Sequence, residues 1–287
     1  MAYQERFVEV PDGLKIFVRD YPAEGAARGV PVICLHGLTR NSADFEAVAP
    51  RIAALGRRVL AVDVRGRGKS DRDPTPARYI PPTYVGDVLF LMNSLDIARA
   101  VFVGTSMGGL MTMLIAAMAP GRVAAAVLND VGPVVNTGGL ARIAQYVGKT
   151  PPQPSWAALT ALIKTTQAAA FPDADDAFWQ TFARRTGRAL ADGRVEFDYD
   201  PKIAHIFEQP PAAAAPDLTP IFQALAQVPT LVVHGMLSDI LLPEGIAAMK
   251  ALKPDLEVAE VPRVGHAPTL EEPAAWSAVA NFLARVP

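Results

Sequence analysis

The sequence predicts an α/β fold built on a mostly parallel, eight-stranded sheet. Short continuous apolar runs, which are typical of strands buried on both faces, alternate with stretches of helical spacing. Two alternating segments flank an Asp-Gly turn near the N-terminus, which predicts an antiparallel hairpin. The chain has 287 residues, of which 51% are hydrophobic and 20% charged, so it is long enough for a large core and is not disordered.

The elements follow one another in a regular order. After the hairpin formed by residues 6–10 and 14–20, strands and helices alternate, as expected for parallel strands joined by right-handed crossovers. The expected strands are residues 30–35, 58–62, 100–104, 123–130, 228–235 and 256–261, and the expected helices are residues 45–55, 82–95, 107–119, 243–252 and 273–285.

The alternation breaks after Asp130. Residues 132–217 contain helical stretches at 155–170 and 175–188, a turn signal at Asp192-Gly193 and a Pro- and Ala-rich connector at 210–216. We therefore expect a core domain of residues 1–131 and 218–287 and a helical cap of residues 132–217. The cap leaves and re-enters the sheet at strand ends, where open α/β sheets bind ligands, which favours a lid over a packing appendage.

Composition excludes several classes of function. Lys and Arg total 27 against 29 Asp and Glu, a net charge of -2, so we expect no nucleic-acid partner and no electrostatic attachment to membranes. No signal peptide and no apolar stretch of about 18 residues is seen, so a cytoplasmic location is the default expectation. The single cysteine, Cys34, lies in an apolar run and is expected to be a buried structural thiol.

The most specific local signal is the stretch from Gly104 to Gly108, which reads Gly-Thr-Ser-Met-Gly between a strand and an apolar helix. A serine on such a sharp turn adopts a strained backbone that exposes its hydroxyl, and the flanking glycines let strand and helix approach closely. The helix start also directs free amides toward developing negative charge. Ser106 is therefore a candidate nucleophile, and the alternative is a Gly-rich helix start with a capping serine.

A serine nucleophile needs a base, and an imidazole is the usual one. Among the four histidines, only His266 lies in the loop after the last expected strand. The base in turn needs a carboxylate that orients it. Asp239 is the leading candidate because it follows the strand next to the one that leads to His266. Asp130, at the end of an earlier strand, is the competitor, and Asp63 is expected to be structural.

With these motifs in this order, the chain resembles the α/β-hydrolase fold superfamily over nearly its whole length. The matching segments are His36-Gly37-Leu38, Asp63 to Ser70, Gly104 to Gly108, Gly235 to Asp239 and Gly265-His266. Arg67 is a departure, since many relatives have His in this turn, which is expected to be structural. The insertion resembles the helical cap of serine esterases and lactonases of this superfamily.

The resemblance implies a serine hydrolase that cleaves carboxylic ester or lactone bonds of small to medium, fairly apolar substrates. Ser106 would be the nucleophile, His266 the base and Asp239 the acid, with the backbone N–H groups of Leu38 and Met107 as the oxyanion hole. No metal or cofactor is implied, and the expected partner is a small-molecule substrate, with the oligomeric state left open.

Other readings stay open at this point. Carbon–carbon bond hydrolases of aromatic ring cleavage keep a serine triad, although a Trp commonly follows their catalytic His where Ala267 stands here. A non-catalytic, hydrolase-like binding protein is the alternative from a different class. Arg40 as a carboxylate ligand, and Trp156, Phe178 and Trp179 as pocket residues, are secondary expectations; an exposed cation and cap-sealing aromatics are the simpler interpretations.

Overall fold

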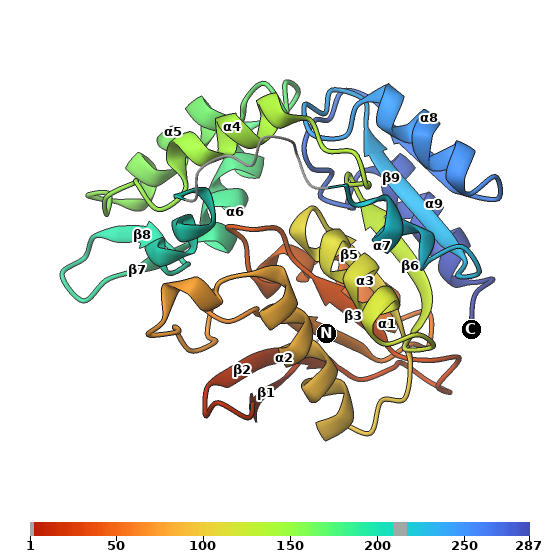
Figure 1. The fold of residues 1–287 in the computed structure, drawn as a ribbon. Coiled ribbons are helices and arrows are strands. Elements are labelled where there is room, and N and C mark those ends of the chain that lie inside the picture. The colour runs from red at the N-terminus through yellow and green to blue at the C-terminus, as the bar shows by residue number, and fades with distance from the viewer. Residues whose placement is uncertain (1–2, 209–216) are drawn as a thin grey trace.

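The computed structural model describes residues 3–208 and 217–287, and the expected connector at 210–216 lies outside them. One eight-stranded sheet has the order β1-β2-β4-β3-β5-β6-β9-β10 (Figure 1). This confirms the predicted α/β fold. The strands are β1 (Gln4–Glu9), β2 (Lys15–Tyr21), β3 (Val32–Leu35), β4 (Val59–Val62), β5 (Ala100–Thr105), β6 (Val123–Asn129), β9 (Thr230–Gly235) and β10 (Glu257–Val261).

The predicted N-terminal hairpin forms the antiparallel part of the sheet. β1 pairs with β2, and β2 pairs antiparallel with β4. From β4 onward every neighbouring pair is parallel. The carboxyl ends of β5, β6, β9 and β10 therefore lie at one edge of the sheet, and the loops that follow these strands can meet there.

The core has two layers because successive strand residues point to opposite faces of the sheet. Val32 and Cys34 pack in one hydrophobic cluster with α1 (Val48–Ala53) and α9 (Pro273–Leu283). Ile33 and Leu35 pack in the other cluster, with α2 (Pro81–Ser94), α3 (Met107–Met118), α7 (Thr219–Gln223) and α8 (Pro243–Leu252). Cys34 is fully buried, as expected, and burial raises the pKa of its thiol.

The helix expected at residues 45–55 is divided. A 3₁₀ turn, η1 (Ser42–Phe45), comes first and is capped by the Asn41 side chain, whose oxygen accepts a hydrogen bond from the Ala43 N–H. The α-helix α1 then begins at Val48, which places Pro50 in its first turn. A proline is tolerated there because its missing N–H would have no partner inside the helix.

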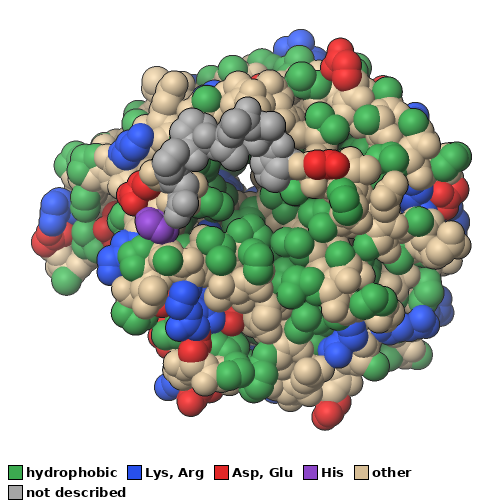
Figure 2. Space-filling view, in the orientation of Figure 1, with side chains coloured by type: hydrophobic (Ala, Val, Ile, Leu, Met, Phe, Trp, Pro, Cys, Tyr) green, Lys and Arg blue, Asp and Glu red, His purple; other side chains and the backbone are tan. Residues whose placement is uncertain are grey.

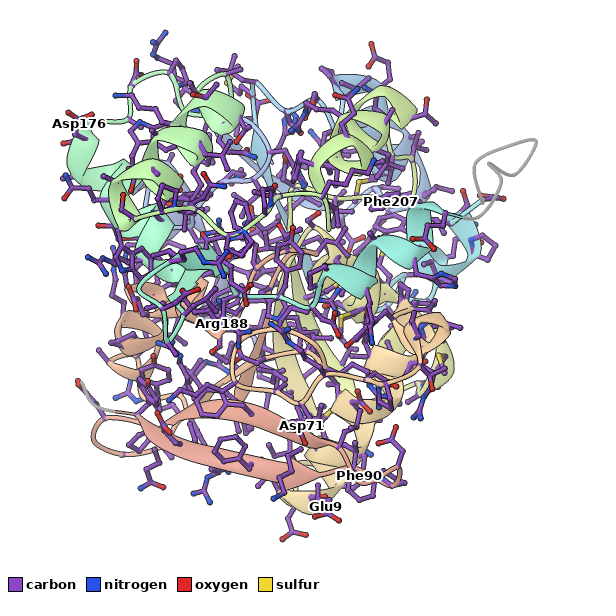
Figure 3. The ribbon with its side chains drawn as sticks, turned by 90° about the vertical axis from the view of Figure 1, so that its left-hand side faces the viewer. Glu9, Asp71, Phe90, Asp176, Arg188 and Phe207 are labelled. Atoms are coloured by element: carbon purple, nitrogen blue, oxygen red, sulfur yellow. The ribbon has the colours of Figure 1, made fainter. Side chains whose placement is uncertain are left out.

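The segment after β6 contributes no strand to the main sheet, and we call residues 132–208 the cap segment. It contains α4 (Thr137–Tyr146), α5 (Trp156–Gln167), α6 (Asp176–Thr186), a hairpin of β7 (Gly187–Ala189) and β8 (Val195–Phe197), and the 3₁₀ helix η3 (Pro201–Phe207). The two predicted helices are present, and the predicted Asp-Gly turn joins β7 to β8. Asp176 of the cap segment lies at the opposite end of the molecule from Glu9 of β1 (Figure 3).

The C-terminal part of the cap segment is bonded to the loop after β4. The N–H of Gly68 donates to the carbonyl of Asp198 at 3.0 Å, and the N–H of Asp200 donates to the carbonyl of Gly66 at 2.7 Å. The Tyr79 hydroxyl, near the short 3₁₀ helix η2 (Pro76–Arg78), donates to the Asp200 carboxylate at 2.7 Å. These bonds tie the cap segment to the core at a point far in sequence from β6.

One face of the molecule is mostly hydrophobic at its centre, over α3 and α7, and charged side chains lie mainly around its rim (Figure 2). Over the described ranges 3–208 and 217–287, no helix combines the length and the apolar character needed to cross a membrane.

Candidate active site

Ser106 stands on the sharp turn that the sequence predicts. It joins the end of β5 to the start of α3 with φ 51° and ψ -113°, a conformation that non-glycine residues rarely adopt. The flanking glycines are required by close packing. A Cβ atom at Gly104 would lie 2.3 Å from the Gly108 carbonyl oxygen, and one at Gly108 would lie 2.0 Å from the Leu35 carbonyl oxygen.

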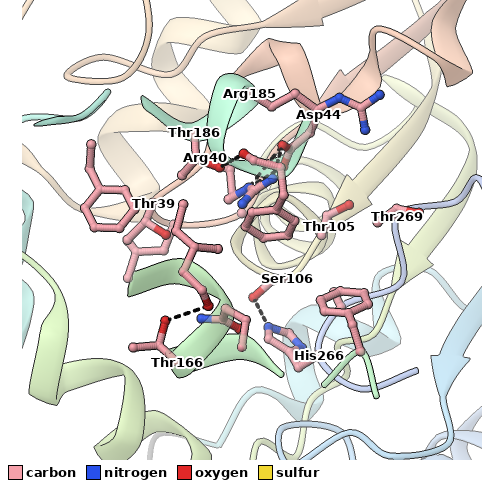
Figure 4. Close-up of a pocket in the computed structure, with 18 of the residues that line it drawn as sticks. Thr39, Arg40, Asp44, Thr105, Ser106, Thr166, Arg185, Thr186, His266 and Thr269 are labelled. Atoms are coloured by element: carbon pink, nitrogen blue, oxygen red, sulfur yellow. Dashed lines mark hydrogen bonds and ion pairs between the residues drawn. The ribbon is translucent and has the colours of Figure 1, made fainter. Parts of the chain in front are cut away.

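The loop after β10 brings His266 to this serine (Figure 4). Its Nε2 lies 2.8 Å from Ser106 Oγ, although the two residues are 160 positions apart in the sequence. The His266 side chain is 10% exposed, so the imidazole is largely shielded from water but still reaches the surface of the site. The structure therefore brings together the predicted nucleophile and the predicted base.

The carboxylate that orients His266 belongs to Asp130. Its Oδ2 lies 2.8 Å from His266 Nδ1, and its Oδ1 accepts a hydrogen bond from the Gly235 N–H at 3.0 Å. The Asp130 side chain is fully buried. Because a carboxylate only accepts hydrogen bonds, Nδ1 carries the proton and Nε2 is free to accept the Ser106 hydroxyl proton.

The structure does not place the predicted acid, Asp239, against His266. Asp239 forms a bidentate ion pair with Arg142 of α4, in which Arg142 Nε and Nη2 lie 2.6 and 2.9 Å from the two carboxylate oxygens. Its side chain is 41% exposed. The hydrogen bonds from Arg142 lower the pKa of Asp239, with a smaller contribution from the charge of His266. Asp239 thus joins the cap segment to the core.

The geometry after each strand explains this outcome. Asp130 immediately follows β6, the neighbour of the β5 strand that carries Ser106, and so it stays at the sheet edge. Asp239 comes four residues after β9, beyond a turn in which the Ser238 N–H donates to the Gly235 carbonyl. The sequence shows that Asp130 comes directly at a strand end, but the position of β6 beside the strand of Ser106 comes from the sheet order of the structure.

The two predicted oxyanion-hole amides have no competing acceptor in the described part of the chain. Leu38 is the second residue of a turn closed by the Arg40 N–H and the Gly37 carbonyl at 3.1 Å, so its own N–H points out of the turn. Met107 is the first residue of α3, where N–H groups lack intrahelical acceptors. Both amides therefore remain candidates for the oxyanion hole.

His36 fixes the peptide that carries the Leu38 amide. The Val64 N–H donates to His36 Nε2 at 3.0 Å, so the proton resides on Nδ1, which donates to the Gly37 carbonyl at 2.7 Å. Burial lowers the pKa of His36 to about 4, which keeps the ring neutral and preserves this tautomer. The Gly37 carbonyl and the Leu38 N–H belong to one peptide unit, so His36 orients that donor.

Ser106 and His266 line a cavity of about 430 Å³ between the core and the cap segment. Its wall combines aliphatic and aromatic side chains with hydroxyl groups. The hydroxyl-bearing wall includes Thr39, Thr105, Thr150, Thr166, Thr181 and Thr186.

The arginines in the cavity wall are bound to carboxylates of the same chain. Arg40 forms a bidentate pair with Asp44, with its Nε 2.9 and 3.0 Å from the carboxylate oxygens (Figure 4). Arg185 of α6 pairs with Glu46 and Glu271. Both of the cavity's arginines are therefore bound to acids of this chain, so the cavity offers a substrate little net charge.

The secondary expectations, about Arg40 and three aromatic residues, have different outcomes. Arg40 lies in the cavity wall, with its guanidinium 3.8 Å from the centre of the Phe182 ring, so it is not a free exposed cation. Phe178 also lines the cavity. Trp179 is 1% exposed and packs in the aromatic cluster of the cap segment. Trp156 stacks under Arg184 instead of lining the cavity.

Comparisons with known proteins agree with this arrangement. A family model described as alpha/beta hydrolase fold matches residues 30–273. A 3-hydroxybutyrate-oligomer hydrolase of Cupriavidus necator is 34% identical over 257 residues, which cover 88% of this chain and 87% of the relative. A 2-(acetamidomethylene)succinate hydrolase of Mesorhizobium japonicum is 28% identical, covering 83% of this chain and 82% of the relative.

Among solved structures, an alpha/beta hydrolase from Novosphingobium aromaticivorans superimposes with a TM-score of 0.92. It is 44% identical, and the match covers 100% of both chains. The sheet order, the serine turn and the family match over most of the chain lead to the same assignment: this chain belongs to the alpha/beta hydrolase fold family.

Proposed function

We propose that this hydrolase cleaves carboxylic ester or lactone bonds through an acyl-enzyme formed on Ser106. The observation that carries the proposal is the chain of hydrogen bonds from Ser106 through His266 to Asp130, located in the wall of a cavity. A nucleophile, a base and an orienting acid in this geometry are the requirements of acyl transfer.

In the proposed mechanism, Ser106 Oγ attacks the substrate carbonyl carbon while His266 Nε2 takes the hydroxyl proton. Asp130 keeps the imidazole in the required tautomer and stabilises the imidazolium that forms. The tetrahedral intermediate collapses as His266 donates the proton to the leaving alkoxide. Water, deprotonated by His266, then attacks the acyl carbon and releases the acid, which regenerates Ser106.

The Leu38 and Met107 amides are proposed to bind the oxyanion of both tetrahedral intermediates. Such preorganised donors contribute about 3 kcal/mol each in well-studied enzymes, because they face the charge where it develops. Supporting observations are that these N–H groups have no acceptor within residues 3–208 and 217–287, and that they lie in the loop after β3 and at the start of α3.

For the substrate, we propose small to medium esters with no net charge near the scissile bond. The paired arginines of the cavity support this, because a substrate anion would have to displace Asp44 or Glu271. Hydroxyl groups in the wall could bind additional ester oxygens. The similarity to a 3-hydroxybutyrate-oligomer hydrolase over 88% of the chain makes oligomers of short hydroxy acids the first substrates to test.

The test measures hydrolysis of p-nitrophenyl butyrate and of 3-hydroxybutyrate trimer by the wild type and by Ser106→Ala. We expect turnover by the wild type and a loss of about 10⁴-fold or more in the variant. A fluorophosphonate should label one tryptic peptide, the one that contains Ser106. Activity retained by Ser106→Ala, or labelling of another peptide alone, would overturn the assignment of the nucleophile.

The same assay, extended to a ring-fission product and to further esters, separates the other candidates. A carbon–carbon bond hydrolase would cleave a ring-fission product faster than any ester of the panel. A binding protein that keeps the three side chains would react with the fluorophosphonate but show no turnover with any ester.

A further inference from the structure

From sequence alone, the turn that carries Arg67 is expected to be purely structural. In the structure, this side chain contacts both residues of the proposed oxyanion hole. Arg67 Nε donates to the Leu38 carbonyl at 3.0 Å, and Nη2 lies 3.8 Å from the Met107 sulfur. The third nitrogen, Nη1, donates to the Arg65 carbonyl at 2.8 Å. One guanidinium thus joins the two elements that carry the candidate oxyanion donors.

The environment of Arg67 is unusual for a buried cation. The residue is 1% exposed, and it forms no ion pair with any carboxylate in residues 3–208 or 217–287. Arg65, two residues earlier and equally buried, is paired with Asp12, Asp73 and Asp87. A buried charge is costly unless it is paired or well hydrogen-bonded, so the contacts that Arg67 does make must compensate for its desolvation.

Those contacts hold the guanidinium in one place. Its carbon lies 4.8 Å from the centre of the Tyr84 ring and 5.8 Å from that of Tyr79, within the range of cation–π attraction. Tyr79 is in turn bonded to Asp200 of the cap segment. The planar guanidinium is therefore held by two aromatic rings, while its nitrogens contact two carbonyl oxygens and a sulfur.

We propose that Arg67 is a positioning residue that holds the Leu38 and Met107 amides in the geometry that binds the oxyanion. The Leu38 residue is then held on both sides, since His36 bonds the preceding carbonyl and Arg67 bonds its own carbonyl. The positive charge of Arg67, which has no paired carboxylate among the described residues, adds a favourable potential for negative charge at the same position. This inference rests on the proposed function and extends it to a residue that does not touch the substrate.

The test compares Arg67→Met and Arg67→Lys with the wild type. Arg57→Met is the matched control, because Arg57 is also buried and bonded to main-chain carbonyls. Its acceptors are the carbonyls of Val30, before β3, and of Leu283 in α9. For each protein, kcat and KM are measured on p-nitrophenyl butyrate, and Ki is measured for butylboronic acid, which forms a tetrahedral adduct with serine. The melting temperature of each variant shows that the folded form is assayed.

Loss of donor geometry should affect the transition state and not the ground state. We expect Arg67→Met to lower kcat by about 10-fold or more and to raise the boronic acid Ki by a similar factor, while KM changes less than about 2-fold. Arg67→Lys keeps the positive charge but lacks the planar set of N–H donors. It should therefore lose less kcat and less boronic acid affinity than Arg67→Met. Arg57→Met should keep the wild-type kcat and Ki.

Two results would overturn the inference alone. One is an Arg67→Met enzyme whose kcat and Ki match those of Arg57→Met. The other is a loss confined to KM. If Arg67→Met does not fold, Arg67→Lys decides between the same outcomes. A wild type that neither hydrolyses the ester nor binds the boronic acid would instead overturn the proposed function, and the role of Arg67 with it.

Discussion

At the scale of single residues, His36 connects a protonation state to the shape of the site. Its neutral ring accepts a hydrogen bond from the Val64 N–H and donates one to the Gly37 carbonyl. A protonated ring could not accept from Val64. The orientation of the Leu38 amide therefore depends on the burial that keeps His36 neutral.

This burial predicts a pH dependence of stability. Burial lowers the pKa of His36 from 6.5 to about 4 in the folded chain. Between these values the unfolded chain binds a proton that the folded chain does not, so stability falls as the pH is lowered from 6.5 to 4. The free-energy difference between the wild type and His36→Gln should shrink by about 1.4 kcal/mol per pH unit over this range.

The measurement is urea unfolding of both proteins at several pH values. The difference between them is needed because burial raises the pKa of Asp63 to about 6, which changes the wild-type stability in the opposite direction over much of the same range. A difference that stays constant from pH 6.5 to pH 4 would show that the folded chain tolerates a charged His36.

At the scale of elements, the strand–turn–helix unit from β5 to α3 has the strictest steric requirement. A Cβ atom on Gly108 would collide with the main chain of β3, 2.0 Å from the Leu35 carbonyl oxygen. Main-chain atoms of a central strand cannot move aside as a flexible side chain would. The spacing of glycines around Ser106 thus follows from packing and also serves the exposure of the serine.

We predict that Gly108→Ala destabilises the fold by at least about 2 kcal/mol, the cost of overpacking a rigid core. Gly86→Ala is the matched control, because Gly86 lies in α2 and an added Cβ would have no described atom within 4 Å other than the adjoining residues and backbone of its own helix. This second variant should stabilise the fold by about 0.5–1 kcal/mol through helix propensity.

Unfolding in urea measures both changes. Equal stability of Gly108→Ala and the wild type would mean that β3 and α3 are further apart than the structure shows.

The elements differ in how well the sequence predicts them. The buried strands are found because continuous apolar runs with turn signals at both ends have few other interpretations. Helix α4 is not predicted, since its first turn contains Gly138 and Gly139, which are poor helix formers. The strands β7 and β8 have three residues each, too few for a periodic pattern to show.

At the scale of the whole molecule, the cap segment is joined to the core beside the cavity. Arg185 of α6 is 12% exposed and pairs with Glu46 and Glu271 of the core. Its carbonyl also accepts a hydrogen bond from Asn41 Nδ2 at 2.9 Å. Because Arg185 lines the cavity, these bonds set the position of one wall relative to Ser106.

We predict that Arg185→Met raises KM several-fold and leaves kcat within about 2-fold, since the variant loosens a binding wall without touching the reacting groups. Arg188→Met is the control, because the carboxylates that Arg188 pairs with, Glu196 and Asp198, both belong to the cap segment. Steady-state kinetics on p-nitrophenyl butyrate measure KM and kcat for both variants and the wild type. An unchanged KM for Arg185→Met would mean that this link does not shape the cavity.

The residues of the site also differ in how well the sequence predicts them. Ser106 is found from a local motif, and His266 from its loop after the last strand. The acid could not be chosen from the sequence, because Asp130 and Asp239 both follow strands that end at the same edge. The choice depends on the turn after β9, which directs Asp239 to Arg142, and on the neighbouring position of β6 beside β5.

The most direct test of the account compares Asp130→Asn with Asp239→Asn on one ester. An asparagine at 130 would favour the wrong imidazole tautomer, so kcat should fall by about 10³- to 10⁴-fold, whereas Asp239→Asn should retain kcat within about 3-fold. The opposite ranking, with Asp239→Asn inactive and Asp130→Asn near the wild type, would contradict the assignment of Asp130 as the partner of His266.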